Sequence, residues 1–253
     1  MKLLLTLLLT VLPLSAFAQE SEVKPFTADR PGAVGGVDIL PKGRLQLETG
    51  FGWERYNMPL YDVTYWTLNS SLLRFGISDN AELRFEAERW LAVEDGEHTN
   101  GFANVAIGTK VRLFDGWKVF PAVSMQADVL VPGGKDSPFL PTEWSGHLGL
   151  LFEHSLTSWL AFGYEGDMDW FDNGRPIYLY GASFVFMPTD RLTLILDEFN
   201  ETAFGVTDSF VELSASWQLS KRVQIDISTD IYLNYPGHYN SLSIGLAWQI
   251  TKH

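Results

Sequence analysis

The stretch KGRLQLETGFGWERY, residues 42–56, alternates strictly between apolar and polar side chains. Leu45 and Leu47 belong to an apolar row, whereas Arg44 and Glu48 belong to a charged row. A period of two places successive side chains on opposite faces of a β-strand. The stretch therefore predicts a strand with one apolar and one charged face, and what the apolar face contacts decides the fold.

The composition indicates the compartment and excludes several classes of protein. Residues 1–18 combine Lys2, the apolar run 3–14 and the small residues Ala16 and Ala18, as is typical of a secretory signal peptide. The formal net charge is −13 and no basic cluster is present, which argues against nucleic acid as a partner. The chain has no Cys, so an exported protein of this sequence needs no disulfides. The five His are scattered, and we expect neither a metal site nor a cofactor.

The alternating pattern recurs along the chain, with the stretches 62–75 and 191–199 less regular than the others. We predict twelve strands, at 43–55, 62–75, 81–92, 102–114, 118–131, 143–154, 159–169, 176–187, 191–199, 208–219, 222–234 and 240–250. No linker divides them, so residues 42–253 are expected to form one domain.

The connectors between these strands are predicted to alternate in length. Five short turns rich in Asp, Ser, Gly and Pro lie at 77–80, 115–118, 155–158, 188–191 and 220–222. Six longer loops lie at 56–61, 93–101, 132–142, 170–175, 200–207 and 235–239. Short turns at one end, an even strand count and apolar-out, polar-in alternation are typical of bacterial outer-membrane barrels.

We therefore predict an all-β fold, a closed antiparallel up-and-down transmembrane β-barrel of about 12 strands. Each strand is long enough to cross the hydrocarbon when tilted. The sheet has to close, because backbone polar groups in lipid need partners. The expected location is the outer membrane of a Gram-negative bacterium, with the lipid bilayer as a partner.

Aromatic residues cluster near both ends of the strands, as interface girdles would require. Those near the long loops are Trp53, Tyr56, Tyr61, Trp90, Trp144, Trp170 and Phe171. Those near the short turns are Phe75, Phe114, Phe120, Trp159, Phe186, Trp217 and Trp248.

If the apolar row faces lipid, the charged row lines the interior. The residues predicted to line this lumen are Arg44, Glu48, Glu82, Arg84, Glu86, Glu88, Lys110, Arg112, Asp128, Glu165, Asp167, Glu212 and Asp226. Two interpretations stay open at this point. The charges line a solute path, in which the acid excess favours cations, or the bases cross-link the acids and fill a narrow barrel.

Residues 19–41 precede the first strand and are too polar and too rich in Gly and Pro to span a membrane. They are expected either to lie in the periplasm or to fold into the lumen as a plug. In the second case Arg30 could pair with lumenal acids.

Two other functions compete with a passive channel for small solutes, including hydrophobic ones. Ser145 and His147 share one face of a strand, so a barrel enzyme acting on lipid is one alternative. Lipid hydrolases of this kind place His before Ser, whereas the order here is reversed, and we expect no enzyme. The other alternative is a soluble periplasmic β-protein that binds an apolar ligand.

The stretch 26–56, FTADRPGAVGGVDILPKGRLQLETGFGWERY, resembles the start of the transporter-like family named for the MetA pathway of phenol degradation. Further resemblance lies at 72–88, 101–114, 130–134 and 160–170. The resemblance implies an outer-membrane barrel that moves small molecules and has no catalytic residues. Such barrels are inserted by the outer-membrane assembly machinery, which commonly reads a C-terminal aromatic residue. Here Ile250 stands at that place.

Overall fold

The computed structural model describes residues 26–58, 61–117, 119–133, 137–171, 174 and 176–251. Its strands are β1 (Leu45–Met58), β2 (Tyr61–Ser78), β3 (Ala81–Glu94), β4 (Glu97–Trp117), β5 (Phe120–Leu130), β6 (Ser145–Ser155), β7 (Leu160–Trp170), β8 (Pro176–Phe186), β9 (Leu192–Ala203), β10 (Val206–Ser220), β11 (Val223–Tyr232) and β12 (His238–Gln249). The expected signal peptide and residues 19–25 lie outside the described residues. In the described part, no helix has the length and apolar character needed to cross a membrane.

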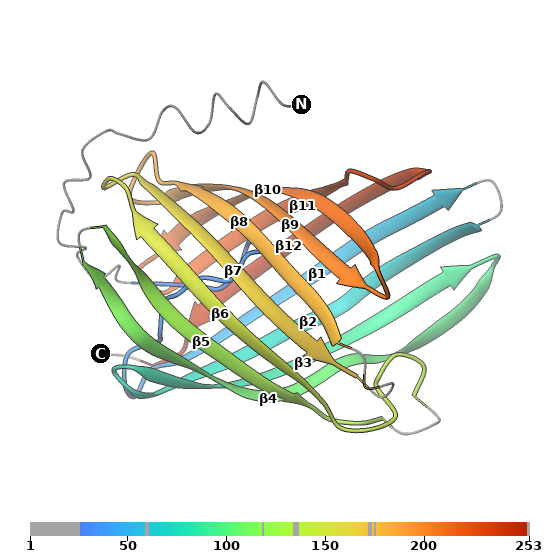
Figure 1. Ribbon diagram of the computed structural model, residues 1–253, viewed down its shortest axis with the longest axis horizontal. Coiled ribbons are helices and arrows are strands. Elements are labelled where there is room, and N and C mark those ends of the chain that lie inside the picture. The colour runs from blue at the N-terminus through green and yellow to red at the C-terminus, as the bar shows by residue number, and fades with distance from the viewer. Residues whose placement is uncertain are drawn as a thin grey trace.

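The twelve strands form one closed barrel (Figure 1). Each strand pairs antiparallel with its neighbours in the chain, and β1 pairs with β12 from Gln46↔Gln249 to Asn57↔His238. This pairing leaves no free sheet edge, which is what a sheet that crosses lipid requires. The predicted fold class and strand number are confirmed.

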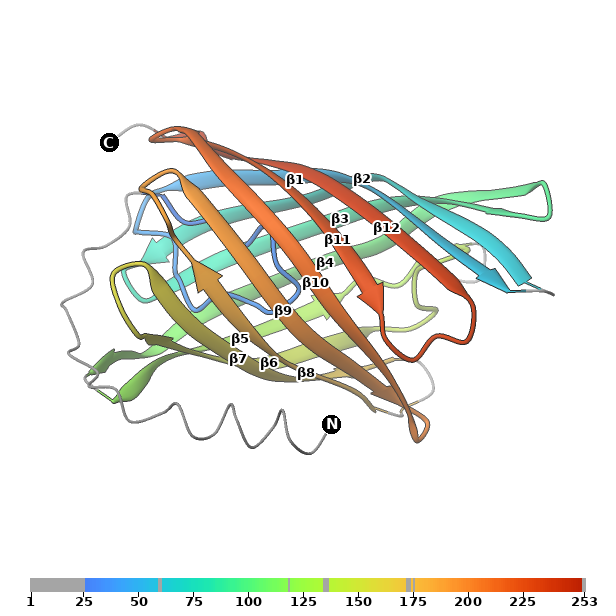
Figure 2. The same ribbon diagram turned by 90° about the horizontal axis from the view of Figure 1, so that it is seen from above.

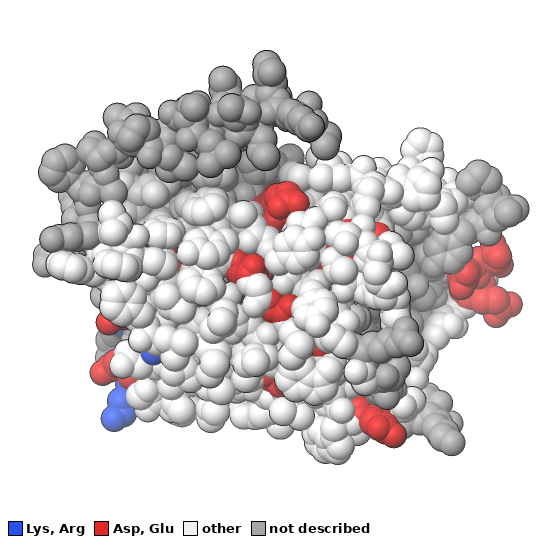
Figure 3. Space-filling model, viewed as in Figure 1, with Lys and Arg blue, Asp and Glu red and all other residues white. Residues whose placement is uncertain are grey.

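The barrel is apolar outside and polar inside. Glu48 and Glu82 are fully buried, whereas the side chains of Ile107 and Ile244 are 52% and 50% exposed. Figure 3 shows one broad face with few charged atoms on its surface. In the described residues no second sheet covers the apolar row, so this row has no protein core to contact. This arrangement, apolar outside and polar inside, is the reverse of that in a soluble protein. It is typical of a barrel in lipid and contradicts a soluble sandwich.

Three of the predicted long loops are wrong. β1 runs to Met58 and β2 begins at Tyr61, and the hairpins expected to open at 93–101 and 200–207 instead continue as paired strands. Asp95 and Gly96, with φ of 50° and 85°, close one of these hairpins in two residues. Two successive left-handed residues give the tight turn that matches strand twist. Polar residues therefore extend the ladder at this end, and the alternation of connector lengths is incomplete.

Two irregular strands owe their pattern to their place in the sheet. β2 carries a bulge between Thr67 and Asn69, so inward positions are odd before it and even after it. In β9 the side chain of Asp197 is buried, whereas Leu194 and Leu196 are exposed. Asp197 therefore points into the barrel.

Residues 26–41, called here the N-terminal segment, form neither helix nor strand. Figure 2 shows the segment looped between opposite walls of the barrel. Phe26, Val34, Val37 and Leu40 from this segment are buried. Since the segment has no ladder of its own, its backbone polar groups need partners on the barrel wall.

Candidate functional site

The predicted lumen residues lie on the inward face of the strands. Those that are buried are Glu48, Glu82, Arg84, Lys110, Asp128, Glu212 and Asp226, and those that are half-buried are Arg44, Glu86, Glu88, Arg112, Glu165 and Asp167. Their role in lining a solute path stays a prediction. Many of them contact the N-terminal segment, and these contacts define the candidate site.

The centre of the site is the carboxylate of Asp29. It contacts Arg74 at 3.1 Å, Lys110 at 2.9 and 3.0 Å, and Arg84. The three cations come from β2, β3 and β4, and their side chains are almost fully buried. Arg74 also holds Glu48 at 3.0 Å. A single carboxylate of the segment thus ties together three neighbouring strands.

These cations also set the protonation state of the site. Burial by itself raises the pKa of the Asp29 carboxyl, but Arg74, Lys110 and Arg84 outweigh burial and hold this pKa well below its usual range. Asp29 is therefore ionised at neutral pH. Its ion pairs are retained well into acid.

Arg30 occupies a notch on the opposite wall. Its guanidinium donates to Asp226 at 3.2 Å and to Ser243 at 3.0 Å. Below it lie Gly50 and Gly245, which face each other across β1 and β12. A Cβ built on Gly50 would lie 2.7 Å from the guanidinium carbon, and one on Gly245 would also clash with Arg30. The two glycines leave the space that Arg30 fills, and Arg30 does contact a lumenal acid.

The backbone of the segment is matched to acids of the wall. The amides of Ala33 and Gly35 donate to Asp197 at 2.8 Å and to Glu165 at 2.6 Å. The Leu40 amide donates to Glu82 at 2.6 Å. The amides of Asp29 and Arg30 both donate to Glu48. Wall carboxylates therefore replace the hydrogen bonds that a strand would supply.

The carbonyls of the segment are matched to donors of the wall. The Gly36 carbonyl accepts from Lys110 at 2.9 Å, and the Val37 carbonyl accepts from Arg112 at 3.0 Å and from Ser124 at 2.6 Å. Further donors to segment carbonyls are Gln46, Arg74 and Gln224. Donor side chains of the wall thus hydrogen-bond to carbonyls of the segment, just as carboxylates of the wall hydrogen-bond to its amides.

Other inward acids do not depend on the segment. Glu86 accepts from Asn104, Glu88 accepts from Ser70, and Asp128 accepts from Gln126. In the described part of the chain, several buried carboxylate oxygens lack a hydrogen-bond partner, namely one each in Asp128, Asp167, Asp197, Glu212 and Asp226. The buried bases therefore lie on β2 to β4, whereas the acids that keep one oxygen without a hydrogen-bond partner lie on β5, β7 and β9 to β11.

Two residues central to the site were not predicted. Arg74 lies beyond the β2 bulge, which shifts the inward parity, and Asp197 lies in a strand whose faces could not be assigned from the sequence. The sequence contains no clear sign of this bulge, because the row that shares the parity of Arg74 also holds Asp62, Thr64 and Ser70. No sequence signal indicates that Asp29 is the partner of three cations.

The two residues considered for catalysis have separate partners. The Ser145 hydroxyl donates to the carbonyl of Glu143 at 3.3 Å, whereas Nδ1 of His147 lies 2.6 Å from Asp169. Neither contact joins the hydroxyl to the imidazole. The geometry supplies no activated serine at this strand.

A second feature lies at the end of the barrel opposite the short turns. Aromatic rings form a chain in which successive centroids are 4.2 to 6.1 Å apart. This aromatic arc runs through Phe139, Trp90, Tyr65, Tyr56, Tyr239, Tyr232, Phe210 and Phe199. Tyr56 and Trp90 were expected in a lipid-facing girdle, which is wrong, because both share the inward parity of acids on their strands. Among the outward aromatics expected at this end, Trp144 and Trp170 are exposed.

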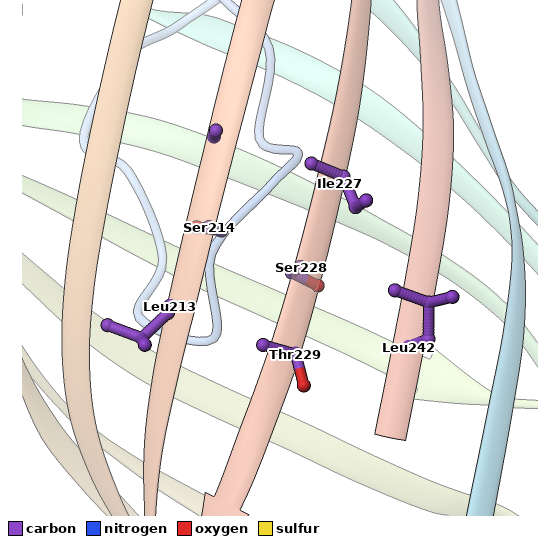
Figure 4. Close-up of a pocket in the computed structure, with 7 residues that line it drawn as sticks. Leu213, Ser214, Ile227, Ser228, Thr229 and Leu242 are labelled. Carbon is purple, nitrogen blue, oxygen red and sulfur yellow. The ribbon is translucent and has the colours of Figure 1, made fainter. Parts of the chain in front are cut away.

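A depression on the outer surface is not part of this site. Figure 4 shows it over β10, β11 and β12, with Leu213, Ile227 and Leu242 among its lining residues. These three side chains belong to the exposed apolar row. The depression therefore lies on the lipid-facing side of the wall.

Comparison with solved structures supports the architecture. The COG4313 outer membrane channel from Pseudomonas putida F1 is similar over 87% of this chain and 100% of its own, with a TM-score of 0.63 and 12% identity. The NanC porin is similar over 81% of this chain and 100% of its own, with a TM-score of 0.54 and 10% identity. These structures are channels or porins, and at such identities the likeness shows the fold. No curated protein matches the sequence.

The family resemblance is confirmed by a match that covers most of the chain. The family described as "Putative MetA-pathway of phenol degradation" matches residues 28–252, which include the N-terminal segment from Ala28 onward and all twelve strands. The chain belongs to this family.

Proposed function

We propose that the protein is a channel in the outer membrane of a Gram-negative bacterium, that it passes small solutes passively, and that the N-terminal segment holds it closed. The observation that carries this proposal is the position of Asp29, which the basic wall of β2 to β4 holds inside a closed barrel. A segment without secondary structure can leave a lumen without disturbing the strands around it. The assembly machinery as a partner stays a prediction.

The interior favours solutes that have both polar and apolar parts. The aromatic arc offers ring faces and edges at the barrel end opposite the short turns. Aromatic rings bind flat apolar groups with favourable dispersion and quadrupole contacts. The level of the N-terminal segment offers charges of both signs. These features support small amphipathic solutes, and they support no chemical conversion.

The closed state is tested by conductance in planar bilayers. The full chain is expected to conduct rarely, and a variant carrying both Asp29→Asn and Arg30→Gln to conduct persistently, because both ion-pair anchors of the segment are removed. Heat-dependent gel mobility checks that each variant still forms a closed barrel. If neither the wild type nor the folded double variant conducts measurably, the channel function is wrong.

A further inference from the structure

The three cations around Asp29, namely Arg74, Arg84 and Lys110, form what we call the cationic site. Two of them have other anionic partners. Arg74 keeps Glu48 and Glu82 at 3.0 and 2.8 Å, and Arg84 keeps Glu82 and Glu86 at 3.1 and 3.2 Å. The arginines therefore stay paired with wall carboxylates whether or not the segment is present.

Lys110 differs from the two arginines. Within the described part of the chain, its ammonium donates to the Asp29 carboxylate and to the Gly36 carbonyl, and both belong to the N-terminal segment. Its side chain is only 1% exposed. A buried ammonium that loses its anion is costly. Departure of the segment thus leaves one positive charge that needs a new partner.

We propose that the cationic site binds the carboxylate of a transiting solute, and that Asp29 occupies the site in place of that solute when the channel is closed. This inference rests on the proposed channel function. Solute and segment compete for the same three cations. A carboxylate that enters the lumen therefore promotes release of the segment, and return of Asp29 expels the carboxylate.

The geometry selects a flat anion with a single charge. One oxygen of Asp29 contacts Arg74 and Lys110, and the other contacts Arg84 and Lys110. Two coplanar oxygens thus satisfy all three cations, as a carboxylate supplies and a neutral amide does not. A dianion such as phosphate would place a second negative charge beside Glu82 and Glu86, for which the site has no free cation.

Release of the segment can be followed through a single thiol, because the chain has no Cys. The reporter is Ala33→Cys in the full chain, labelled by a membrane-impermeant maleimide at constant ionic strength. Propionate is expected to raise the labelling rate at least about tenfold over chloride, in line with the loss of a charged hydrogen bond. Propionamide and phosphate are expected to have little effect.

A matched variant separates this effect from general loosening. Asp226→Asn removes the other ion-pair anchor of the segment and leaves the cationic site intact. It should raise the labelling rate without added propionate and keep a response to propionate, whereas Lys110→Gln should abolish that response. If Asp226→Asn raises labelling but propionate does nothing to the parent protein, the proposed site is wrong.

Direct binding gives a second test. Asp29→Asn removes the internal competitor, so equilibrium dialysis with labelled propionate should show affinity about tenfold higher than wild type. Equal affinity in folded protein would overturn the proposal even if the opened channel conducts. Absence of conductance in the opened variants together with tight propionate binding would instead refute only the channel function.

Discussion

Asp29 and Lys110 form an ion pair in which both carboxylate oxygens accept from one ammonium, at 3.0 and 2.9 Å. The first residue belongs to a segment without secondary structure, and the second belongs to strand β4 of the barrel wall. Ladder hydrogen bonds hold the wall together whether or not this pair exists. The pair therefore stabilises the position of the segment more than the closure of the barrel.

Filling the notch under Arg30 should displace the segment. We expect Gly245→Ala to raise both the conductance and the thiol labelling at residue 33 by at least about tenfold. Its Cβ would clash with Arg30 and lie 2.6 Å from Asp226, so the charged hydrogen bond between these two residues would be lost. Planar-bilayer recording measures the first quantity. Gly166→Ala is the control, since a Cβ there meets nothing within 4 Å. Equal effects of the two substitutions would show that the notch has no role.

The ion pairs of Asp29 should withstand mild acid. The pKa of Asp29 is lowered in the folded protein, so its stabilising effect is complete above the unfolded value of about 3.9 and is lost only as the pH falls through the folded value. Asp29→Asn should lower the free energy of unfolding by about 3 kcal/mol, the scale for breaking a buried pair. Urea titrations of both proteins should give the same difference at pH 7 and pH 5. A difference that halves between these pH values would contradict an ionised, paired Asp29.

Much of the fold could be predicted from the sequence, because lipid imposes a simple rule on each strand. A period of two places Ile244 outside and Glu48 inside, and closure then follows from the need to pair every backbone group in lipid. The failures occurred where this rule does not operate. The Asp95–Gly96 hairpin extends past the predicted strand ends, where water and lipid no longer distinguish the two faces.

The site was less predictable than the fold. Its charged wall residues follow from alternation, but their pairing with Asp29 depends on where an unpatterned segment lies in three dimensions. Arg74 was missing from the predicted lumen residues because one bulge reversed the parity of β2. A lumen also tolerates either free or paired charges, so alternation alone does not distinguish a path from a filled barrel.

A charged side chain in the lipid-facing row should destabilise the barrel more near the middle of a strand than near its end. Ile244 is central in β12 and half exposed, so Ile244→Arg should lower the free energy of unfolding by about 2–4 kcal/mol in liposomes. Leu233 lies in the turn after β11 and is also exposed, and Leu233→Arg should cost only about 0–1 kcal/mol. Denaturant unfolding in the same lipid compares the two. Equal costs would mean that Ile244 does not face the hydrocarbon.

The acidic part of the interior should control ion preference once the channel is open. Glu86 contacts Arg84 and Asn104, and Asp128 has a buried oxygen without a hydrogen-bond partner in the described residues. In the Gly245→Ala background, Glu86→Gln together with Asp128→Asn should lower the ratio of K⁺ to Cl⁻ permeability at least about fivefold, since even one charge beside a wet path changes an ion's energy by about 1 kcal/mol. Reversal potentials in a KCl gradient measure this ratio.

Glu97→Gln, at the exposed tip of the β3–β4 hairpin, is the control and should leave the ratio unchanged. If the double variant also leaves it unchanged, these two acids do not line the conducting path.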